Sequence, residues 1–363
     1  MKRITATALL AVSLLMGAHG QSLPKSAAAS HLMERMAGLQ KSGIMFGHQD
    51  DPVYGTSWKW ETGRSDVLEV CGDYPAVMGF DLGKLELGSD ENLDGVPFDR
   101  MRREIIAQSQ RGGIVTLSWH PWNPSTGENA WDPSGHAVTA ILPDGALTVK
   151  FAGWLAKVAG FINSLRTGDG QKVPVIFRPW HEMSGAWFWW GSKSCTPEEY
   201  RQLYRYTRQT LEKAGCDNII WAYSPNLSDG AQTEANFMKF YPGDDYVDLL
   251  GTDVYQFSAD NSVYQANLRK ELDVLKVVGE KHHKLIALTE TGYQNVPDPT
   301  WFTQCLLPVI KDYPICYVLL WRNAWDNPKE NYVAAPGKPT VNDFRKFYQD
   351  KLTLFVKDIR KNK

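Results

Sequence analysis

The sequence predicts a single (β/α)₈ barrel, that is, one α/β TIM barrel. Short apolar segments recur along the chain, helix-like segments separate most of them, and polar or aromatic residues follow the apolar segments. Alternating strands and helices are typical of parallel βαβ units, and eight such units close into a barrel. The carboxyl ends of barrel strands point to one side, so the residues that follow them are expected to share one site.

The composition is that of a large globular domain. The 363 residues are 43% hydrophobic and 22% charged, which excludes a disordered or fibrous chain. The formal net charge of −2 provides no field to attract nucleic acid or an anionic membrane surface, so neither is expected as a partner. Trp is unusually frequent: 14 Trp stand beside 14 Phe, and the flat apolar faces of indole rings are typical of surfaces that bind sugars.

The first twenty residues have the features of a secretory signal peptide. Lys2 and Arg3 precede an apolar stretch over 4–16, and small residues lead to a cleavage site near Gly20. The apolar stretch is shorter than the roughly 20 residues that cross a bilayer. We therefore expect an exported protein, periplasmic or secreted, whose single folded domain comprises residues 21–363.

Five cysteines are present, and none belongs to a C-x-x-C pair. Their odd number and spacing disfavour a zinc ribbon and a dense disulfide framework. One or two disulfides and a set of buried free thiols both remain open. The cysteines are Cys71, Cys195, Cys216, Cys305 and Cys316.

The predicted elements follow one another in regular order. The eight strands are Ile44–His48, Ala76–Leu82, Gly113–His120, Val173–Arg178, Asn218–Ser224, Asp248–Tyr255, Leu285–Glu290 and Cys316–Trp321. The helix-like stretches are Phe98–Arg111, Phe151–Leu165, Pro197–Ala214, Tyr264–Val278 and Trp301–Lys311. A doubly wound open sheet is the main alternative, but Gly47-His48-Gln49-Asp50 after the first strand is not the glycine-rich phosphate loop of that fold.

The segment with the most chemical information is Phe177–Gly191. It places Glu182 at the end of the fourth strand among aromatic residues that include Trp180, Trp187 and Trp190. We expect Trp180 and Trp187 to remove water from the carboxyl group, which disfavours its charged form and raises its pKa. Such a group is still protonated near neutral pH, so Glu182 is predicted to be a general acid.

A second carboxylate, Glu290, ends the seventh predicted strand. A carboxylate at the end of an apolar strand usually has a hydrogen-bond or ion-pair partner, or a functional role. Tyr255 and Arg322 are the expected donors that keep Glu290 ionised. Two strand-end carboxylates in opposed environments suit a retaining glycosidase, in which one acts as acid/base and the other as nucleophile.

These residues give the chain a resemblance to a known family. His181-Glu182 with Trp187, Asp253-Val254-Tyr255, Thr289-Glu290-Thr291-Gly292 and Trp321-Arg322 resemble glycoside hydrolase family 26, the β-mannanases, over nearly the whole chain from Gly47-His48-Gln49 onward. The resemblance implies a barrel that hydrolyses β-1,4-mannosidic bonds in mannan and manno-oligosaccharides, with Glu182 as acid/base and Glu290 as nucleophile. It also implies that His120, His181, Trp187 and Tyr255 contact the substrate.

Further substrate contacts are predicted from position in the sequence. Because Trp189 and Trp190 are adjacent in a Glu-bearing loop, they are not expected both to face inward; at least one should be a sugar platform, and Trp190 is predicted to contact the substrate. Asn226 begins a formal glycosylation sequon, but it follows the fifth strand and is expected to face the substrate. The remaining predicted contacts are Asp253, Trp321 and Arg322, with Trp58-Lys59-Trp60 at a distal subsite.

No cofactor and no metal are expected. Asp90–Gly95 matches the first half of a calcium loop, but Met101 stands where the final Glu is required. Three other functions remain open. They are the same mechanism on a β-1,3-1,4-glucan or a β-1,3-xylan, a non-catalytic glycan-binding barrel, and a metal-dependent hydrolase that uses His48, Asp50, Asp51 and His120.

Long, aromatic segments follow the first, second, third and eighth strands. Loops of this length at the carboxyl face of a barrel are expected to wall off one end of a cleft. A walled cleft favours chain ends and short oligosaccharides, although the resemblance implies mostly internal cleavage. We expect a monomeric endo-mannanase that degrades β-mannan and manno-oligosaccharides chiefly to mannobiose, and a bias toward chain ends remains open.

Overall fold

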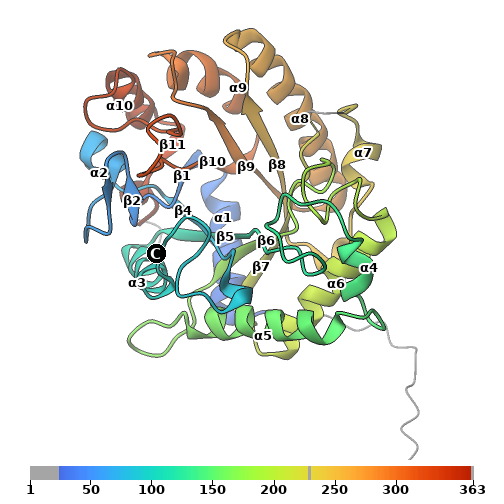
Figure 1. Ribbon diagram of the computed structural model, residues 1–363. Helices are drawn as coiled ribbons and strands as arrows, with labels where there is room; N and C mark the ends of the chain where they lie inside the picture. Colours follow the sequence, from blue (N-terminus) through green and yellow to red (C-terminus); the bar gives the residue numbers. More distant parts are fainter. Residues whose placement is uncertain (1–23, 228–229, 361–363) are drawn as a thin grey trace, which may run out of the picture.

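The computed structural model describes residues 24–227 and 230–360, so the predicted signal peptide lies outside the described residues. Within them, parallel strands form a closed barrel in the order β1-β4-β5-β6-β7-β8-β9-β10, and β10 pairs back with β1 (Figure 1). This closure confirms the predicted (β/α)₈ barrel and excludes the open doubly wound sheet.

The barrel strands coincide with the predicted ones to within two residues, except that β9 continues three residues further. Strands of this kind are buried on both faces, which explains why the sequence shows continuous apolar runs in place of alternation. The strands are β1 (Ile44–Gln49), β4 (Val77–Asp81), β5 (Ile114–Trp119), β6 (Val175–Pro179), β7 (Ile219–Tyr223), β8 (Leu249–Gln256), β9 (Leu285–Tyr293) and β10 (Ile315–Leu320).

Helices surround the barrel, as Figure 1 shows for α3, α5, α6, α8 and α10. The predicted helix Trp301–Lys311 begins as a π-helical turn, Trp301–Leu306, because Pro308 has no N–H for a regular helical hydrogen bond. The helices are α1 (Ala27–Leu39), α2 (Asp66–Cys71), α3 (Phe98–Arg111), α4 (Ala137–Ile141), α5 (Thr148–Ser164), α6 (Pro197–Lys213), α7 (Glu234–Met238), α8 (Asn261–His282), α9 (Leu307–Ile310), α10 (Val341–Gln349) and α11 (Val356–Ile359).

Smaller elements complete the described chain. A hairpin of β2 (Tyr54–Gly55) and β3 (Trp58–Lys59) follows β1, and β11 (Thr353–Leu354) pairs with β1 outside the barrel. Two 3₁₀ turns, Leu85–Leu87 and Asp244–Tyr246, lie in loops.

The amino-terminal end of the barrel is closed by α1, which the strand pattern did not predict. Its buried residues Leu32, Met36 and Leu39 join the apolar cluster that fills the barrel interior together with Met45 and Ile176. In Figure 1, α1 lies within the outline of the ring of strands. A substrate site is therefore left to the opposite end, where the strands finish.

The five cysteines are all free thiols, which resolves the alternative that the sequence left open. Burial raises the pKa of each thiol to about 12. Among the described residues, no helix combines the length and the apolar character needed to cross a membrane.

Candidate active site

A cavity of about 370 Å³ opens at the carboxyl ends of the barrel strands. Seven of the eleven predicted site residues line it, from six different strand ends. The lining residues are His120, Trp131, Glu182, Trp187, Phe188, Asn226, Tyr255, Phe257, Glu290, Trp321 and Tyr332. A larger hollow of about 730 Å³ beside α1 has a single carboxylate in its lining, Asp169, and so lacks a carboxylate pair.

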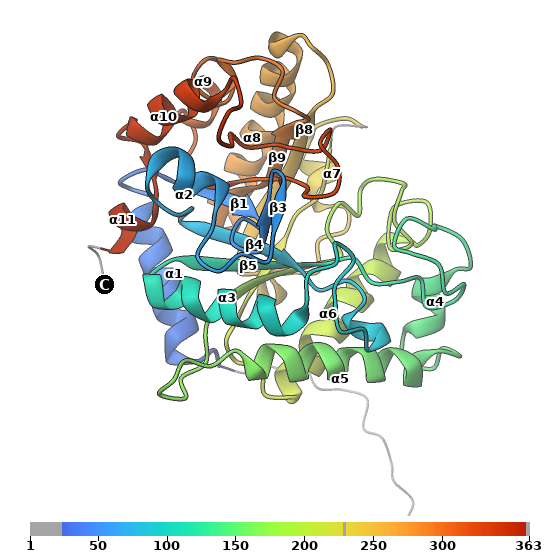
Figure 2. The ribbon, with the colours of Figure 1, turned by 60° about the vertical axis from the view of Figure 1, so that its left-hand side comes forward.

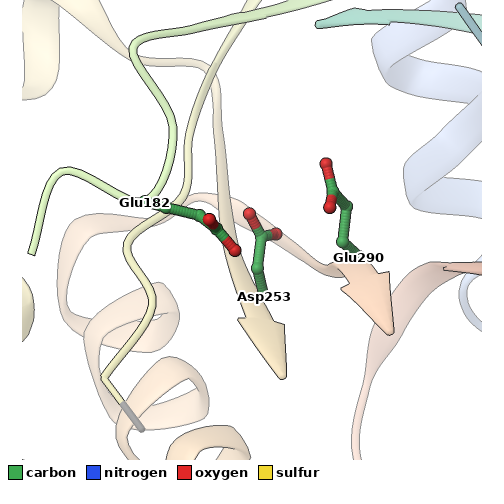
Figure 3. Close-up of side chains that lie close together, drawn as sticks. All are labelled: Glu182, Asp253 and Glu290. Atoms are coloured by element: carbon green, nitrogen blue, oxygen red, sulfur yellow. The ribbon is translucent and has the colours of Figure 1, made fainter. Parts of the chain in front are cut away.

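Two carboxylates, Glu182 and Glu290, line the cavity, and Asp253, a predicted substrate contact, lies fully buried beside them and outside the lining. Figure 3 shows Glu182, from the segment after β6, close to Asp253 on β8 and Glu290 on β9. One oxygen of each carboxylate lies within 4.8 Å of one oxygen of the other two. Retaining glycosidases hold their two carboxyl groups about 5–5.5 Å apart, whereas inverting enzymes need roughly 6.5–9.5 Å. The distance between Glu182 and Glu290 therefore suits a direct attack on the sugar by one of them.

Arg178, on β6, forms ion pairs with two of these carboxylates. Its Nη1 donates to Asp253 at 2.8 Å and its Nη2 donates to Glu290. Burial alone would lower the pKa of the Arg178 guanidinium, but the charges of Asp253 and Glu290 raise it above the usual value. The guanidinium thus remains charged and compensates the buried carboxylates.

Both oxygens of Glu290 accept hydrogen bonds. The Tyr255 hydroxyl donates to Oε2 at 2.8 Å, as predicted, and Arg178 donates to Oε1. The prediction for Arg322 is wrong, because its guanidinium binds Asp94 and Glu330. The sequence contained a signal for Arg178, since an arginine inside an apolar strand needs a buried partner.

Glu182 lies half-buried in the cavity wall. Burial and the nearby charge of Glu290 raise the pKa of Glu182 to about 7. Two donors act in the opposite direction: Asn226 Nδ2 at 3.3 Å and the indole N–H of Trp187 at 2.9 Å lower this pKa. The carboxyl group is therefore divided between its protonated and ionised forms near neutral pH, as a group that gives and later takes a proton must be.

The backbone around Glu182 adopts a conformation that is rare for residues other than glycine. Trp180 and Glu182 have φ values of 57° and 54°, and strained residues of this kind cluster at active sites. Hydrogen bonds hold the strained turn: the Glu182 N–H donates to Ser224 O at 2.8 Å, and the Tyr200 hydroxyl donates to Trp180 O at 2.9 Å.

The prediction that Trp180 removes water from Glu182 is wrong. Its ring is fully buried and packs against Trp119 and Phe151, in the layer between the barrel and its helices. Trp187 is the indole that contacts the Glu182 carboxyl group.

Two histidines lie side by side, and one of them faces the cavity. His120 lines the cavity, and its Nδ1 is 2.7 Å from Asp81. Its Nε2 is 3.0 Å from Nε2 of His181, which lies behind the cavity wall. Burial lowers the pKa of His120, but Asp81 and Glu290 together outweigh this effect, so the pKa lies above its usual value. Burial and the charge of Arg178 lower the pKa of His181 well below its usual value, so His181 is neutral.

The geometry is that of a glycosidase barrel, and the chain as a whole matches one family. Residues 23–354 match the model of glycosyl hydrolase family 26. The chain belongs to glycosyl hydrolase family 26. It is therefore a glycoside hydrolase.

Relatives within family 26 share this barrel. A β-mannanase structure from Bacteroides ovatus is 46% identical, covers 92% of this chain and 96% of its own, and has a TM-score of 0.90. The mannan endo-1,4-β-mannosidase of Bacillus subtilis strain 168 is 30% identical over 312 residues, which are 82% of this chain and 78% of the relative. That of Bifidobacterium adolescentis is 31% identical over 90% of this chain, but the chain spans about a third of that relative's length, 34%.

Trp190, a predicted substrate contact, and its neighbour Trp189 lie behind the cavity wall of this family 26 chain. Trp189 and Trp190 are both fully buried, so the expectation that one of them would be exposed is wrong. Both fit inward because each indole N–H has a buried acceptor, Pro121 O at 2.9 Å for Trp189 and His181 O at 2.8 Å for Trp190. Trp190 stacks on Phe188 at 4.4 Å and so supports a residue that lines the cavity.

The cavity of this family 26 chain also contains aromatic residues that sequence reasoning did not single out. Trp131 is 48% exposed, and its ring is stacked on His120 at 5.1 Å. Phe257 is 88% exposed, and Tyr332 packs against Tyr255. Their sequence signal is weak, because the first two lie in loops and Tyr332 follows the last strand by twelve positions.

Three loops join to form a wall beside the cavity. Arg322, after β10, binds Asp94 at 2.7 Å and Glu330 at 3.0 Å. Lys59 of the β2–β3 hairpin lies 3.5 Å from the centre of the Trp325 ring. Figure 2 shows this hairpin beside the loop after β10. The predicted distal-subsite residues Trp58 and Trp60 therefore belong to the wall, where Trp58 is buried against Asp66.

Glu182, Asp253 and Glu290 also form the one group of three possible metal ligands found among the described residues. The group fits a cation poorly, because the Arg178 guanidinium already binds two of its members. His48 and Asp51, which a metal-dependent hydrolase would need, are fully buried and bind each other at 2.9 Å.

Proposed function

We propose that this family 26 glycoside hydrolase cleaves β-1,4-mannosidic bonds in mannan and manno-oligosaccharides by double displacement. The observation that carries the proposal is the pair of Glu182 and Glu290, with oxygens within 4.8 Å and opposed environments. The relatives named as mannan endo-1,4-β-mannosidases support the choice of mannan.

In the first step, a Glu290 oxygen attacks the anomeric carbon while Glu182 gives its proton to the departing glycosidic oxygen. The C–O bond to the leaving sugar breaks, and a covalent glycosyl–Glu290 ester forms. Arg178 and Tyr255 hold Glu290 in place for this attack. The negative charge at Glu290 is consumed as the ester forms, which removes one of the two causes of the raised pKa of Glu182.

In the second step, the deprotonated Glu182 takes a proton from water as the water oxygen attacks the anomeric carbon. The ester breaks, Glu290 leaves as a carboxylate, and the sugar is released with its original β configuration. The fall in the pKa of Glu182 between the two steps suits its change from acid to base.

The test is the mature protein incubated with mannan, a β-1,3-1,4-glucan and a β-1,3-xylan. We expect hydrolysis of mannan, with the β-anomer appearing first in early-time proton NMR spectra. Preferred hydrolysis of another glycan would move the proposal to the same mechanism on that glycan. Binding without hydrolysis would favour a non-catalytic barrel, and an initial α-anomer would overturn the nucleophile role of Glu290.

We further propose that the wall of three loops biases cleavage toward mannobiose. Arg322 joins loops from the beginning and the end of the chain, and neither it nor Trp60 lines the cavity. A sugar chain that enters from the open side then has few positions beyond the cleavage site. Export to the periplasm or the medium is part of the same proposal, because a polymeric mannan is met outside the cytoplasm. We also propose that the enzyme is a monomer.

A further inference from the structure

A fully buried glutamate of α8, Glu271, lies outside the cavity and outside the catalytic machinery. Its carboxylate accepts hydrogen bonds from Thr252 Oγ1 at 2.5 Å, from Gln232 Nε2 at 3.3 Å and from the backbone N–H of Leu227 at 3.4 Å. Burying a carboxylate is costly unless donors compensate for the lost water. These donors come from β8 and from the segment after β7, so Glu271 joins that segment to the barrel.

The segment after β7 is held from both sides. On the β8 side, Pro225 O accepts from the backbone N–H of Asp253 at 3.3 Å; it also lies 3.2 Å from Thr252 Oγ1, whose single proton points to the nearer Glu271. On the β6 side, the Ser184 hydroxyl accepts from the backbone N–H of Asn226 at 2.9 Å and donates to its carbonyl oxygen. The position of Asn226 is therefore set by contacts that do not involve the substrate.

Glu182 depends on this segment for its own position. Its backbone N–H donates to Ser224 O at 2.8 Å, and its carboxyl oxygen accepts from Asn226 Nδ2 at 3.3 Å. Since Glu182 has a strained, left-handed backbone, neighbouring contacts must hold it there. Asn226 precedes Leu227, whose N–H is bound by Glu271.

We infer that Glu271 is a positioning residue for Glu182, acting through Leu227 and Asn226. This inference rests on the proposed role of Glu182 as acid/base. Glu271 touches neither the substrate cavity nor Glu182. Its carboxylate fixes the segment that aims the Asn226 amide at the acid, and so keeps the acidic proton directed at the glycosidic oxygen.

The test is Glu271→Gln in the full chain, because the variant has nearly the same shape but places an amide N–H₂ among hydrogen-bond donors. A misplaced proton donor slows a reaction more when the leaving group depends more strongly on protonation. We expect kcat/KM on manno-oligosaccharides to fall about tenfold, and kcat/KM on an aryl β-mannoside with a good leaving group to fall less than about threefold.

Glu104→Gln is the matched control. Glu104 is a buried glutamate of α3 whose oxygens bind Arg100 at 3.1 Å and Arg111 at 3.7 Å, both on the same helix. If this variant only loses stability, its kcat/KM should fall by the same factor on both substrates. If Glu271→Gln lowers kcat/KM by the same factor on both substrates, or does not lower it, the inference is overturned.

Thr252→Val is the second variant, for the case that Glu271→Gln does not fold. It removes the hydroxyl that donates to Glu271 and keeps the side-chain shape. We expect the same selective loss, of smaller size, and equal losses would overturn the inference. Glu182→Gln distinguishes a failure of the acid role of Glu182 from a failure of the positioning role of Glu271. If Glu182→Gln lowers kcat/KM equally on both substrates, the acid role is wrong. If Glu182→Gln lowers kcat/KM mainly on manno-oligosaccharides and Glu271→Gln does not, only the positioning role is wrong.

Discussion

The indole N–H of Trp187 donates to the carboxyl group of Glu182 at 2.9 Å. The ring thus has two opposite effects, because it removes water from the acid and also stabilises the ionised form of the acid. The sequence suggests only the first effect, since a tryptophan near a carboxyl group says nothing about which edge of its ring faces that group.

Replacing Trp187 by Phe separates these effects. The variant keeps an apolar ring but loses the N–H donor, so the pKa of Glu182 should rise. Because the first step needs protonated Glu182, the alkaline limb of kcat/KM should move to higher pH. The measurement is the pH dependence of manno-oligosaccharide hydrolysis, and a limb that moves to lower pH would show that desolvation by the indole is the larger effect.

The unmodified enzyme should have a bell-shaped pH profile. Its alkaline limb should lie near pH 7, because burial and Glu290 raise the pKa of Glu182 to about 7. Activity is retained below this value and is lost as the pH rises through it. A limb more than two pH units away would contradict the assignment of the acid.

The two carboxylates should respond differently to substitution. Glu290→Ala should remove nearly all turnover of every substrate, because no covalent intermediate can form. Glu182→Gln should cost far less on an aryl glycoside with a good leaving group than on mannan, since such a leaving group needs little protonation. Steady-state kinetics on both substrates check this, and equal losses for both variants would reverse or reject the roles.

Arg178→Met should destabilise the fold and inactivate the enzyme. The variant leaves Asp253 and Glu290 buried without their shared cation, and breaking a buried pair of this kind costs about 3–5 kcal/mol. Urea unfolding should show the loss at neutral pH. The loss should shrink at low pH, where the two carboxyl groups become protonated, and a variant as stable as the parent would show that water replaces the guanidinium.

Arg322→Ala tests the wall. It removes the bond to Asp94, which joins the loop after β10 to the loop after β4, and the bond to Glu330 within the loop after β10, so longer products should appear at the expense of mannobiose. Product chromatography at low conversion measures this, together with mannan viscosity against reducing ends. A steep viscosity drop and a broad product ladder in the parent enzyme would already reject the chain-end bias.

The barrel could be predicted from the sequence because each strand is an apolar run with its own boundary signals. The catalytic pair could be predicted because both residues lie directly at strand ends. The cation beside Glu290 could be predicted only in part. Arg178, inside an apolar strand, needs a buried partner, but only the three-dimensional structure shows that this partner is Glu290, whereas Arg322 binds Asp94.

The orientation of the aromatic residues could not be predicted from the sequence. Trp180 and Trp187 are separated by a turn with left-handed backbone at Trp180 and Glu182, which sends one ring to the core and the other to the cavity. No periodicity in the sequence encodes that reversal. The burial of Trp190 has a related cause, since the acceptor of its indole N–H is a backbone carbonyl, which the sequence does not reveal.

The closure of the barrel has a consequence for how the chain is made. Strand β1 pairs with β4 on one side, but on the other side its partner is β10, with Met45 opposite Tyr317. During synthesis β1 is therefore produced first and waits with one edge open until almost the whole chain exists. Contacts so distant in sequence form slowly, and an open strand edge invites pairing with other chains. Correct folding should thus require that the growing chain does not pair with other copies of itself. During folding, the amides of β1 should be among the last to become protected from hydrogen exchange.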